Sequence, residues 1–189
     1  DNGADAFPQN PLQWSDFDGD GLGDNWGNIS WTDRPEGWPG QYVESIAENE
    51  QDTCPLQFGN SNQNGAYGCP DLDGDGWYDA IDSFINEPSQ WADSDGDGFG
   101  DNLDGFNGDY CKDIAGDSTE DRKGCLDSDS DGYSDADEFW TKYSGGDVFP
   151  QDPTQWSDID GDGYGDNPGY PLSDDCIEVA GDSSVDRTG

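Results

Sequence analysis

Apolar residues are sparse along this chain and are separated by many glycines and prolines. Leu, Ile, Val and Phe make up about 14% of the 189 residues, against 28 glycines and 11 prolines. Glycine and proline interrupt regular elements, so the pattern predicts turns, single helical turns and very short strands. In one stretch, from about Gln41 to Glu50, the pattern favours a short helix.

Three nearly identical stretches stand out from this polar background. They read QWSDFDGDGLGDN, QWADSDGDGFGDN and QWSDIDGDGYGDN, and their tryptophans are Trp14, Trp91 and Trp156. Related Asp-rich segments follow Cys69 and Cys125. A full unit therefore contains a cysteine element, an Asp-rich loop, a stretch with Phe, Pro and Gln-Trp, and a second Asp-rich loop. Periods of this length indicate a tandem array in which each unit contacts its neighbours.

The cysteine elements divide the chain into repeats. We predict a partial repeat over 1–53, repeats over 54–110 and 111–175, and the start of another over 176–189. Insertions at 26–53, which is rich in tryptophan, and at 139–146 break the period. The last cysteine element has only one cysteine, so we expect the array to continue, either by peptide bond or by subunit contact. The tryptophans of the first insertion either pack locally or dock against a neighbouring subunit.

Charge explains why burial alone is not expected to fold this chain. It has 45 acidic residues, 6 basic residues and no histidine, a formal charge of -39. Low apolar content with high net charge is typical of disordered chains. The many aromatic residues, the five cysteines and the fixed spacing of the acids argue against disorder. Core-poor chains are commonly stabilised by disulfides or metals.

We expect no nucleic-acid binding, because the charge repels phosphates, and no membrane insertion.

The acids are concentrated in five loops with the pattern D-x-D-x-D-G-x-x-D. Three alternate carboxylates converge on one point only if the loop wraps around it, and the glycine permits the sharp turn. The seventh position can add a backbone carbonyl, which is the ligand order of an EF-hand calcium loop. Oxygen ligands alone favour Ca²⁺ over zinc. Packed carboxylates repel one another without a cation, so the metal is a condition of the local structure.

We number these loops from the N-terminus. The predicted ligands are Asp16, Asp18, Asp20, Leu22 and Asp24 in loop 1; Asp71, Asp73, Asp75, Trp77 and Asp79 in loop 2; Asp93, Asp95, Asp97, Phe99 and Asp101 in loop 3; Asp127, Asp129, Asp131, Tyr133 and Asp135 in loop 4; and Asp158, Asp160, Asp162, Tyr164 and Asp166 in loop 5.

The twelfth position differs between the loops. It holds Asp82 in loop 2, Asp104 in loop 3 and Glu138 in loop 4, and we predict these as further ligands. Loops 1 and 5 have Gly27 and Gly169 there, so they need a ligand from elsewhere. We expect five or more calcium ions per chain.

The loops resemble thrombospondin type 3 repeats. The segments that carry the resemblance are DLDGDGWYD, DSDGDGFGDN and DIDGDGYGDN, with the Cys-Pro pair before loop 2. The resemblance implies irregular coil wrapped around many calcium ions and an extended extracellular rod. The Phe-Pro-Trp stretches and the insertion at 26–53 are additions to that family's pattern. The expected fold is therefore mostly coil with very short strands, an elongated tandem array of calcium-stapled, disulfide-linked loops with little hydrophobic core.

Cysteine spacing predicts two local disulfides. Cys54 and Cys69, and likewise Cys111 and Cys125, bracket the same element, and we predict that each pair is bonded. Cys176 then needs a partner outside this segment or is a free thiol. Disulfides imply an oxidising, extracellular compartment. Asn28 begins an N-glycosylation triplet and is a candidate for modification.

These features favour a structural protein of the cell surface or extracellular space. The first interpretation is a calcium-rigidified stalk or filament subunit that joins further copies of itself or of the same repeat end to end. The alternative is an adhesion or dockerin-like module of a larger cell-surface protein, with a protein or glycan partner. Dockerin-type units need a helix after each loop. We do not expect an enzyme, because no nucleophile motif is present and the acids are assigned to metal.

Overall fold

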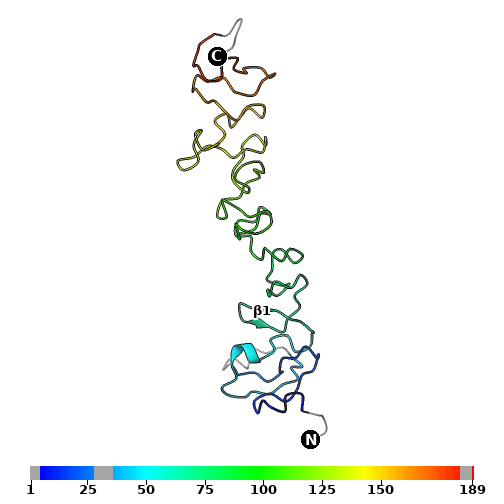
Figure 1. The fold of residues 1–189 in the computed structure, drawn as a ribbon. Coiled ribbons are helices and arrows are strands. Elements are labelled where there is room, and N and C mark those ends of the chain that lie inside the picture. Colours follow the sequence, from blue (N-terminus) through cyan, green and yellow to red (C-terminus); the bar gives the residue numbers. More distant parts are fainter. Residues whose placement is uncertain (1–4, 28–35, 184–188) are drawn as a thin grey trace. The chain divides into compact units, whose positions relative to one another are not determined.

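Almost all of the computed structural model is coil and turns (Figure 1). It describes residues 5–27, 36–183 and 189. The regular elements there are a 3-10 helix, η2 (Glu48–Glu50), and two strands, β1 (Asn62–Gln63) and β2 (Ala66–Tyr67). The strands form an antiparallel hairpin in which Asn62 pairs with Tyr67. The predicted irregular, loop-rich fold is confirmed.

The helix predicted from Gln41 to Glu50 is wrong except for its last turn. Residue Tyr42 instead forms a parallel bridge with Trp26. The amide of Trp26 donates to the carbonyl of Gln41, and the amide of Val43 donates to the carbonyl of Trp26. This extended pairing uses the backbone groups that a helix would need, so only Glu48–Glu50 closes a helical turn.

The interior is built from polar side chains. The buried hydrophobic residues in the described part are Ile46, Cys69 and Cys125. The largest fully buried side chains are instead the three glutamines of the Gln-Trp pairs: Gln13, Gln90 and Gln155. The prediction of little hydrophobic core therefore holds, and the tryptophans do not form such a core.

Gln13 and Gln155 each form hydrogen bonds that connect the two ends of an Asp loop. The Gln13 Nε2 donates to the carbonyls of Asn25 (3.1 Å) and Glu50 (2.8 Å), and its Oε1 accepts the amide of Asn25 (2.9 Å). Gln155 makes the same reciprocal pair with Asn167, at 3.0 and 2.9 Å. Buried polar groups require such partners, and the side-chain amide supplies a donor and an acceptor at once.

The chain separates into two compact units, Asp1–Trp91 and Ala92–Gly189. The predicted repeat boundaries at 54, 111 and 176 form a different division, which stays a prediction. Each unit contains one of the predicted disulfides, Cys54–Cys69 and Cys111–Cys125, with Cα atoms 5.0 Å apart in both. Cys176 is a free cysteine here. The candidate glycosylation residue Asn28 lies outside the described residues.

The glutamine contacts predict a large cost for a small truncation. We expect Gln13→Ala to lower the free energy of unfolding by about 2–4 kcal/mol, because it leaves the Asn25 amide and two carbonyls without partners. Chemical denaturation in saturating calcium measures the change. The exposed Gln57 gives the matched control, Gln57→Ala, for which we expect a change within about 0.5 kcal/mol. Equal stabilities for the two variants would contradict this account of the core.

Candidate metal sites

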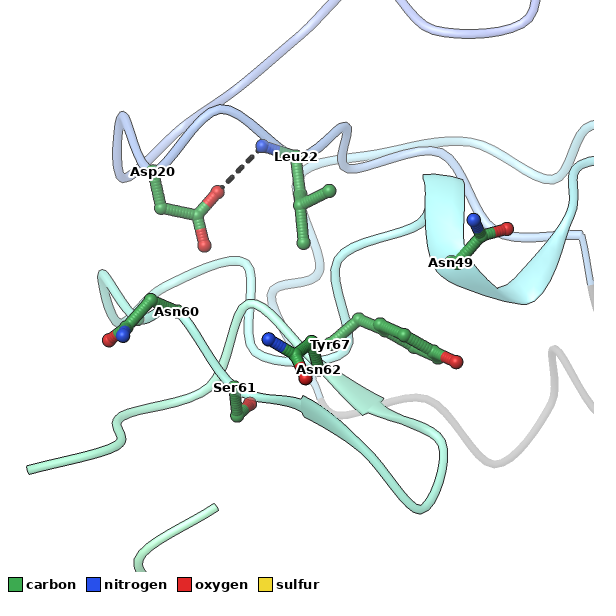
Figure 2. Close-up of a pocket in the computed structure, with 8 residues that line it drawn as sticks. Asp20, Leu22, Asn49, Asn60, Ser61, Asn62 and Tyr67 are labelled. Carbon is green, nitrogen blue, oxygen red and sulfur yellow. Dashed lines mark hydrogen bonds between the residues drawn. The ribbon is translucent and has the colours of Figure 1, made fainter. Parts of the chain in front are cut away.

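The five Asp loops fold in the same way. In each, the two carboxylate oxygens of the first aspartate accept hydrogen bonds from the backbone amides of the residues three and five positions later. In loop 1 the donors to Asp16 are Gly19 (2.7 Å) and Gly21 (3.1 Å). The third aspartate accepts the amide two residues on, as Asp20 does from Leu22 at 2.8 Å (Figure 2). The glycine after the third aspartate has a positive φ in every loop, from 93° at Gly163 to 99° at Gly76 and Gly132. A residue with a Cβ is strained there, so the glycine permits the turn.

These bonds gather the carboxylates of each loop. The first three aspartates of all five loops have ligand oxygens within 4.8 Å of one another. The fourth aspartate is hydrogen-bonded to the start of its loop. Its backbone amide donates to the carbonyl of the residue before the first aspartate, as the Asp24 amide does to the Ser15 carbonyl at 3.1 Å. The sequence prediction that alternate aspartates converge is confirmed, and each cluster could hold a metal ion.

A further buried aspartate lies against every loop, and we call these five residues the closing aspartates. They are Asp52, Asp82, Asp109, Asp147 and Asp174, which close loops 1 to 5 in that order. Their side chains are between 0% and 9% exposed. Each site therefore adds one carboxylate from outside the loop to the three that converge within it.

The same backbone bond positions all five closing aspartates. The amide of each donates to the carbonyl of the residue just before the fourth loop aspartate: Asp52 to Gly23 (2.9 Å), Asp82 to Tyr78 (3.1 Å), Asp109 to Gly100 (2.8 Å), Asp147 to Ser134 (2.9 Å) and Asp174 to Gly165 (2.7 Å). The intervening chain is very different in length, since Asp82 follows its loop almost directly and Asp52 stands near the end of the insertion at 26–53. The bond fixes the carboxylate whatever the length of the connection.

Much of the carboxylate surface has no protein partner. Sixteen buried side-chain N or O atoms of the described residues have no hydrogen-bond partner, and fourteen of them are aspartate oxygens from these sites. Four closing aspartates show how this arises: one oxygen accepts the amide two residues on, from Cys54, Cys111, Phe149 or Cys176, and the other is unpartnered. Buried polar atoms are costly without partners, so these oxygens fit a cation.

Electrostatics agrees with the geometry. Burial, with a smaller contribution from the charges of Asp20, Asp18 and Asp24 and opposed by the amide of Cys54, raises the pKa of Asp52 to about 8. Burial and neighbouring loop aspartates likewise raise the pKa of Asp147 to about 7 and that of Asp109 to about 6. These carboxyls avoid charge unless a cation balances it.

The cysteine elements contact loops 1, 3 and 5 from outside the loop. The amides of Gly116 and Gly181 donate to the third aspartates of loops 3 and 5, both at 2.9 Å. In loop 1, Gly59 and Asp20 line the same polar hollow, together with Asn60, Ser61, Asn62 and Tyr67 (Figure 2). A Cβ on Gly124 would stand 2.3 Å from a closing-aspartate oxygen, and one on Gly68 2.5 Å. Only glycine leaves room for the carboxylate at these two positions.

The residues predicted at the twelfth position have different surroundings. Asp82 is the closing aspartate of loop 2, 9% exposed. Asp104 and Glu138 are exposed, whereas Asp109 and Asp147 are buried against loops 3 and 4. Whether Asp104 and Glu138 bind metal stays a prediction, but the structure offers better-placed carboxylates.

Two local patterns could have identified the missed residues. Three closing aspartates stand two residues before the first cysteine of an element, at Cys54, Cys111 and Cys176. The other two stand two residues before a phenylalanine, at Phe84 and Phe149. The repeat places an aspartate at each of these positions.

The seventh-position residues have a second role besides the predicted carbonyl. Trp77 of loop 2 stacks on Trp91, with centroids 5.8 Å apart, and Tyr133 of loop 4 stacks on Trp156 at 4.4 Å. In two of the three Gln-Trp pairs the tryptophan therefore packs on the loop that precedes it in the chain. Metal ligation by the carbonyls of Leu22, Trp77, Phe99, Tyr133 and Tyr164 stays a prediction.

Comparison with known proteins adds no family assignment. No protein-family model matches the chain, and no curated protein sequence matches it. Among the described residues, no helix is both long and apolar enough to cross a membrane.

The closing aspartates predict which carboxylates matter for metal binding. We expect Asp109→Asn to weaken calcium binding at one site by roughly tenfold or more, because it removes a buried charged ligand while the amide oxygen can still accept the Cys111 amide. The exposed Asp104 gives the control, Asp104→Asn, for which we expect a change below about threefold. Calorimetric calcium titration distinguishes the two. A larger effect of Asp104→Asn would restore the EF-hand twelfth position as the ligand.

The raised pKa values predict proton release on metal binding. Asp52, Asp109 and Asp147 have folded pKa values of about 8, 6 and 7, above the ordinary value of 3.8. Their contribution to the stability of the metal-free fold is complete below that value and is lost as pH rises through about 6 to 8. Calcium binding at pH 6 should therefore release up to about three protons, and at pH 9 almost none. Calorimetry in buffers of different ionisation heat counts them, and equal counts at both pH values would contradict the prediction.

Proposed function

We propose that this chain is a structural calcium-binding repeat protein, a tandem array that calcium rigidifies into a stalk or a filament subunit. The observation that carries the proposal is the set of five equivalent clusters, each with three converging loop carboxylates, one buried closing aspartate beside them and unpartnered oxygens. The same construction in all five places favours one shared role over five separate surface features.

The chemistry of the ligands favours calcium. Every candidate side-chain ligand is a carboxylate, and clusters of hard oxygen ligands suit Ca²⁺, which takes six to eight of them. Zinc prefers histidine and cysteine, whereas this chain has no histidine and four of its five cysteines are bonded to each other. Five ions per chain is the number that the clusters support, and shared ions would add to it.

Connections between successive loops support an array. The cysteine element 54–69 touches loop 1 through Gly68 and loop 2 through the amides of Asn62 and Gln63, which donate to Gly76. Thr119 and Glu120 of the second element donate to Gly132 of loop 4 in the same way. The resemblance to thrombospondin type 3 repeats and the two disulfides point to an extracellular place, where disulfides persist.

A dockerin-like adhesion module is the weaker candidate. Such modules need a helix after each loop, and the described segments that follow these loops are turns and bridges. The segment after loop 4 illustrates this, since the amides of Ser144, Gly145 and Gly146 all donate to the Thr141 carbonyl in one compact turn.

Metal stoichiometry and chelation test the proposal directly. We expect elemental analysis of dialysed protein to give five or more calcium ions per chain, and EDTA to abolish the near-ultraviolet signal of the stacked Trp77–Trp91 and Tyr133–Trp156 pairs. Magnesium at equal concentration serves as the control and should not restore the signal. Fewer than two calcium ions, or a fold indifferent to EDTA, would overturn the proposal.

A further inference from the structure

The polar hollow beside loop 1 is formed by three parts of the chain (Figure 2). Its volume is about 560 Å³, within the range of about 300–1,000 Å³ that small-molecule sites occupy. All of its lining residues belong to one compact unit, Asp1–Trp91. Loop 1 contributes Asp20 and Leu22, η2 in the insertion at 26–53 contributes Asn49, and the first cysteine element contributes residues that include Asn60, Asn62 and Tyr67.

The longest uncharged stretch of the chain forms one wall of this hollow. Residues 53–70 contain no acidic and no basic residue, whereas the whole chain has 45 acidic and 6 basic residues. The lining residue that can carry charge is Asp20. Its Oδ1 accepts the Leu22 amide, and its buried Oδ2 belongs to the carboxylate cluster of loop 1. The hollow therefore offers a ligand mainly neutral donors and acceptors.

Three asparagine side chains supply these donors and acceptors. Those of Asn49 and Asn60 are exposed and have no hydrogen-bond partner among the described residues. The Oδ1 of Asn62 accepts one bond, from the Gln63 Nε2 at 3.0 Å. Each side-chain amide has two donor hydrogens and an acceptor oxygen, so this wall suits a ligand whose own donors and acceptors lie close together.

The second cysteine element, 111–125, provides an internal comparison because its backbone is paired in the same way. The amides of Ser61 and Ser118 each donate to the carbonyl of the second cysteine of their element, at 3.1 and 3.2 Å. Asn60 and Asp117, which precede these serines, are therefore equivalent positions. The first element has an amide where the second has an acid.

The residues two positions before the second cysteines are equivalent as well. They are Tyr67 and Lys123, whose carbonyls accept the amides of Thr53 at 2.8 Å and Tyr110 at 3.0 Å. The first element thus has a phenol ring where the second has an ammonium group. Both differences remove charge, and this one adds an aromatic surface, beside a hollow to which the insertion adds Asn49.

We propose that this hollow binds a neutral saccharide. Sugar hydroxyls place donors and acceptors close together, as side-chain amides require, and the C–H face of a sugar ring can pack on an aromatic ring such as Tyr67. The formal charge of -39 disfavours anionic ligands, and the carboxylate clusters suit a metal cation better than neutral amides do. This binding activity goes beyond the structural role proposed above.

A peptide strand fits the hollow less well. Peptides that add to a sheet use the free backbone groups of an edge strand, but the amides of Asn62 and Gln63 in β1 already donate to the Gly76 carbonyl, at 2.8 and 3.0 Å. Peptide-binding grooves also hold apolar anchors, and Leu22 is the aliphatic side chain in this lining.

An NMR titration of the full 189-residue chain in millimolar calcium tests the proposal. The probes are four neutral disaccharides: cellobiose, maltose, lactose and N,N′-diacetylchitobiose. We expect at least one of them to shift the side-chain amide signals of Asn49, Asn60 and Asn62 in a saturable way. The exposed Asn86 does not line the hollow and its signal should not move. No saturable shift with any of the four would overturn the proposal.

The equivalent residues of the second element give matched variants. Asn60→Asp and Tyr67→Lys introduce the side chains of Asp117 and Lys123, which occupy the same backbone positions there. Each should weaken saccharide binding roughly tenfold or more, because each removes a neutral contact and adds a charge to be desolvated. Asn86→Asp is the control, for which we expect a change below about twofold.

Calcium content and formation of the Cys54–Cys69 bond show whether each variant keeps the parent fold. Folded variants that bind as the parent does would exclude the hollow as the site, and equal weakening by Asn86→Asp would reveal a general charge effect. Digalacturonate bound as tightly as the neutral probes would contradict the ligand class. The shifts in the parent chain do not depend on any variant. A parent chain with its calcium sites filled and no saccharide bound would overturn this inference and leave the proposed function standing.

Discussion

Repulsion between carboxylates that the fold holds together is the constraint on which the rest of this structure depends. Two carboxylates about 5 Å apart repel by roughly 3 kcal/mol at an effective dielectric near 20, and each site holds three converging loop carboxylates with a closing aspartate beside them. The backbone amides that position the aspartates satisfy only part of their oxygens. The fold therefore exists either with protons on residues such as Asp52 or with a cation among the oxygens. Metal binding and folding are linked in such a chain, because there is little apolar burial to substitute for them.

One backbone hydrogen bond explains how the sites tolerate large insertions. The closing aspartate reaches its loop through its own amide, which pairs with the residue before the fourth loop aspartate. Lengthening a connection costs little, since loop-closure free energy grows only with the logarithm of length. The insertion at 26–53 can thus carry Trp26 and Trp38, whose rings meet edge to face at 5.0 Å, without disturbing Asp52. Variation is confined to the connections, and the sites keep a constant geometry.

The sequence predicts the loop aspartates of each site but, apart from Asp82 of loop 2, misses the closing aspartates. The loop aspartates are separated by fixed short spacings, so a periodic pattern reveals their convergence, and the two disulfides follow from spacing as well. Asp52 and Asp147 come from variable distances along the chain, so the spacing of the loop does not point to them, and the bridge to the loop places them at the site. The EF-hand ligand order led to Asp104 and Glu138 as predicted twelfth-position ligands, because that order assumes a helix that continues the loop. The short helix predicted near Gln41 failed for a related reason: pairing with Trp26 is a tertiary contact that local propensity does not contain.

Two kinds of joint alternate along the chain, and this alternation accounts for the presence of two loops in each period. Loops 1, 3 and 5 are closed by an aspartate two residues before a cysteine, and the element that follows reaches the loop through glycines such as Gly116. Loops 2 and 4 are closed by an aspartate two residues before a phenylalanine and are covered by a stacked tryptophan. In the first joint a disulfide holds the covering element at loops 1 and 3, and in the second a buried glutamine such as Gln155 holds the next loop. Neither joint needs a hydrophobic core, because each has at its centre a carboxylate cluster that could hold a cation, with hydrogen bonds or one ring pair around it. A chain with so few apolar residues can extend by repeating these two joints, whereas a core-dependent fold of this composition could not form.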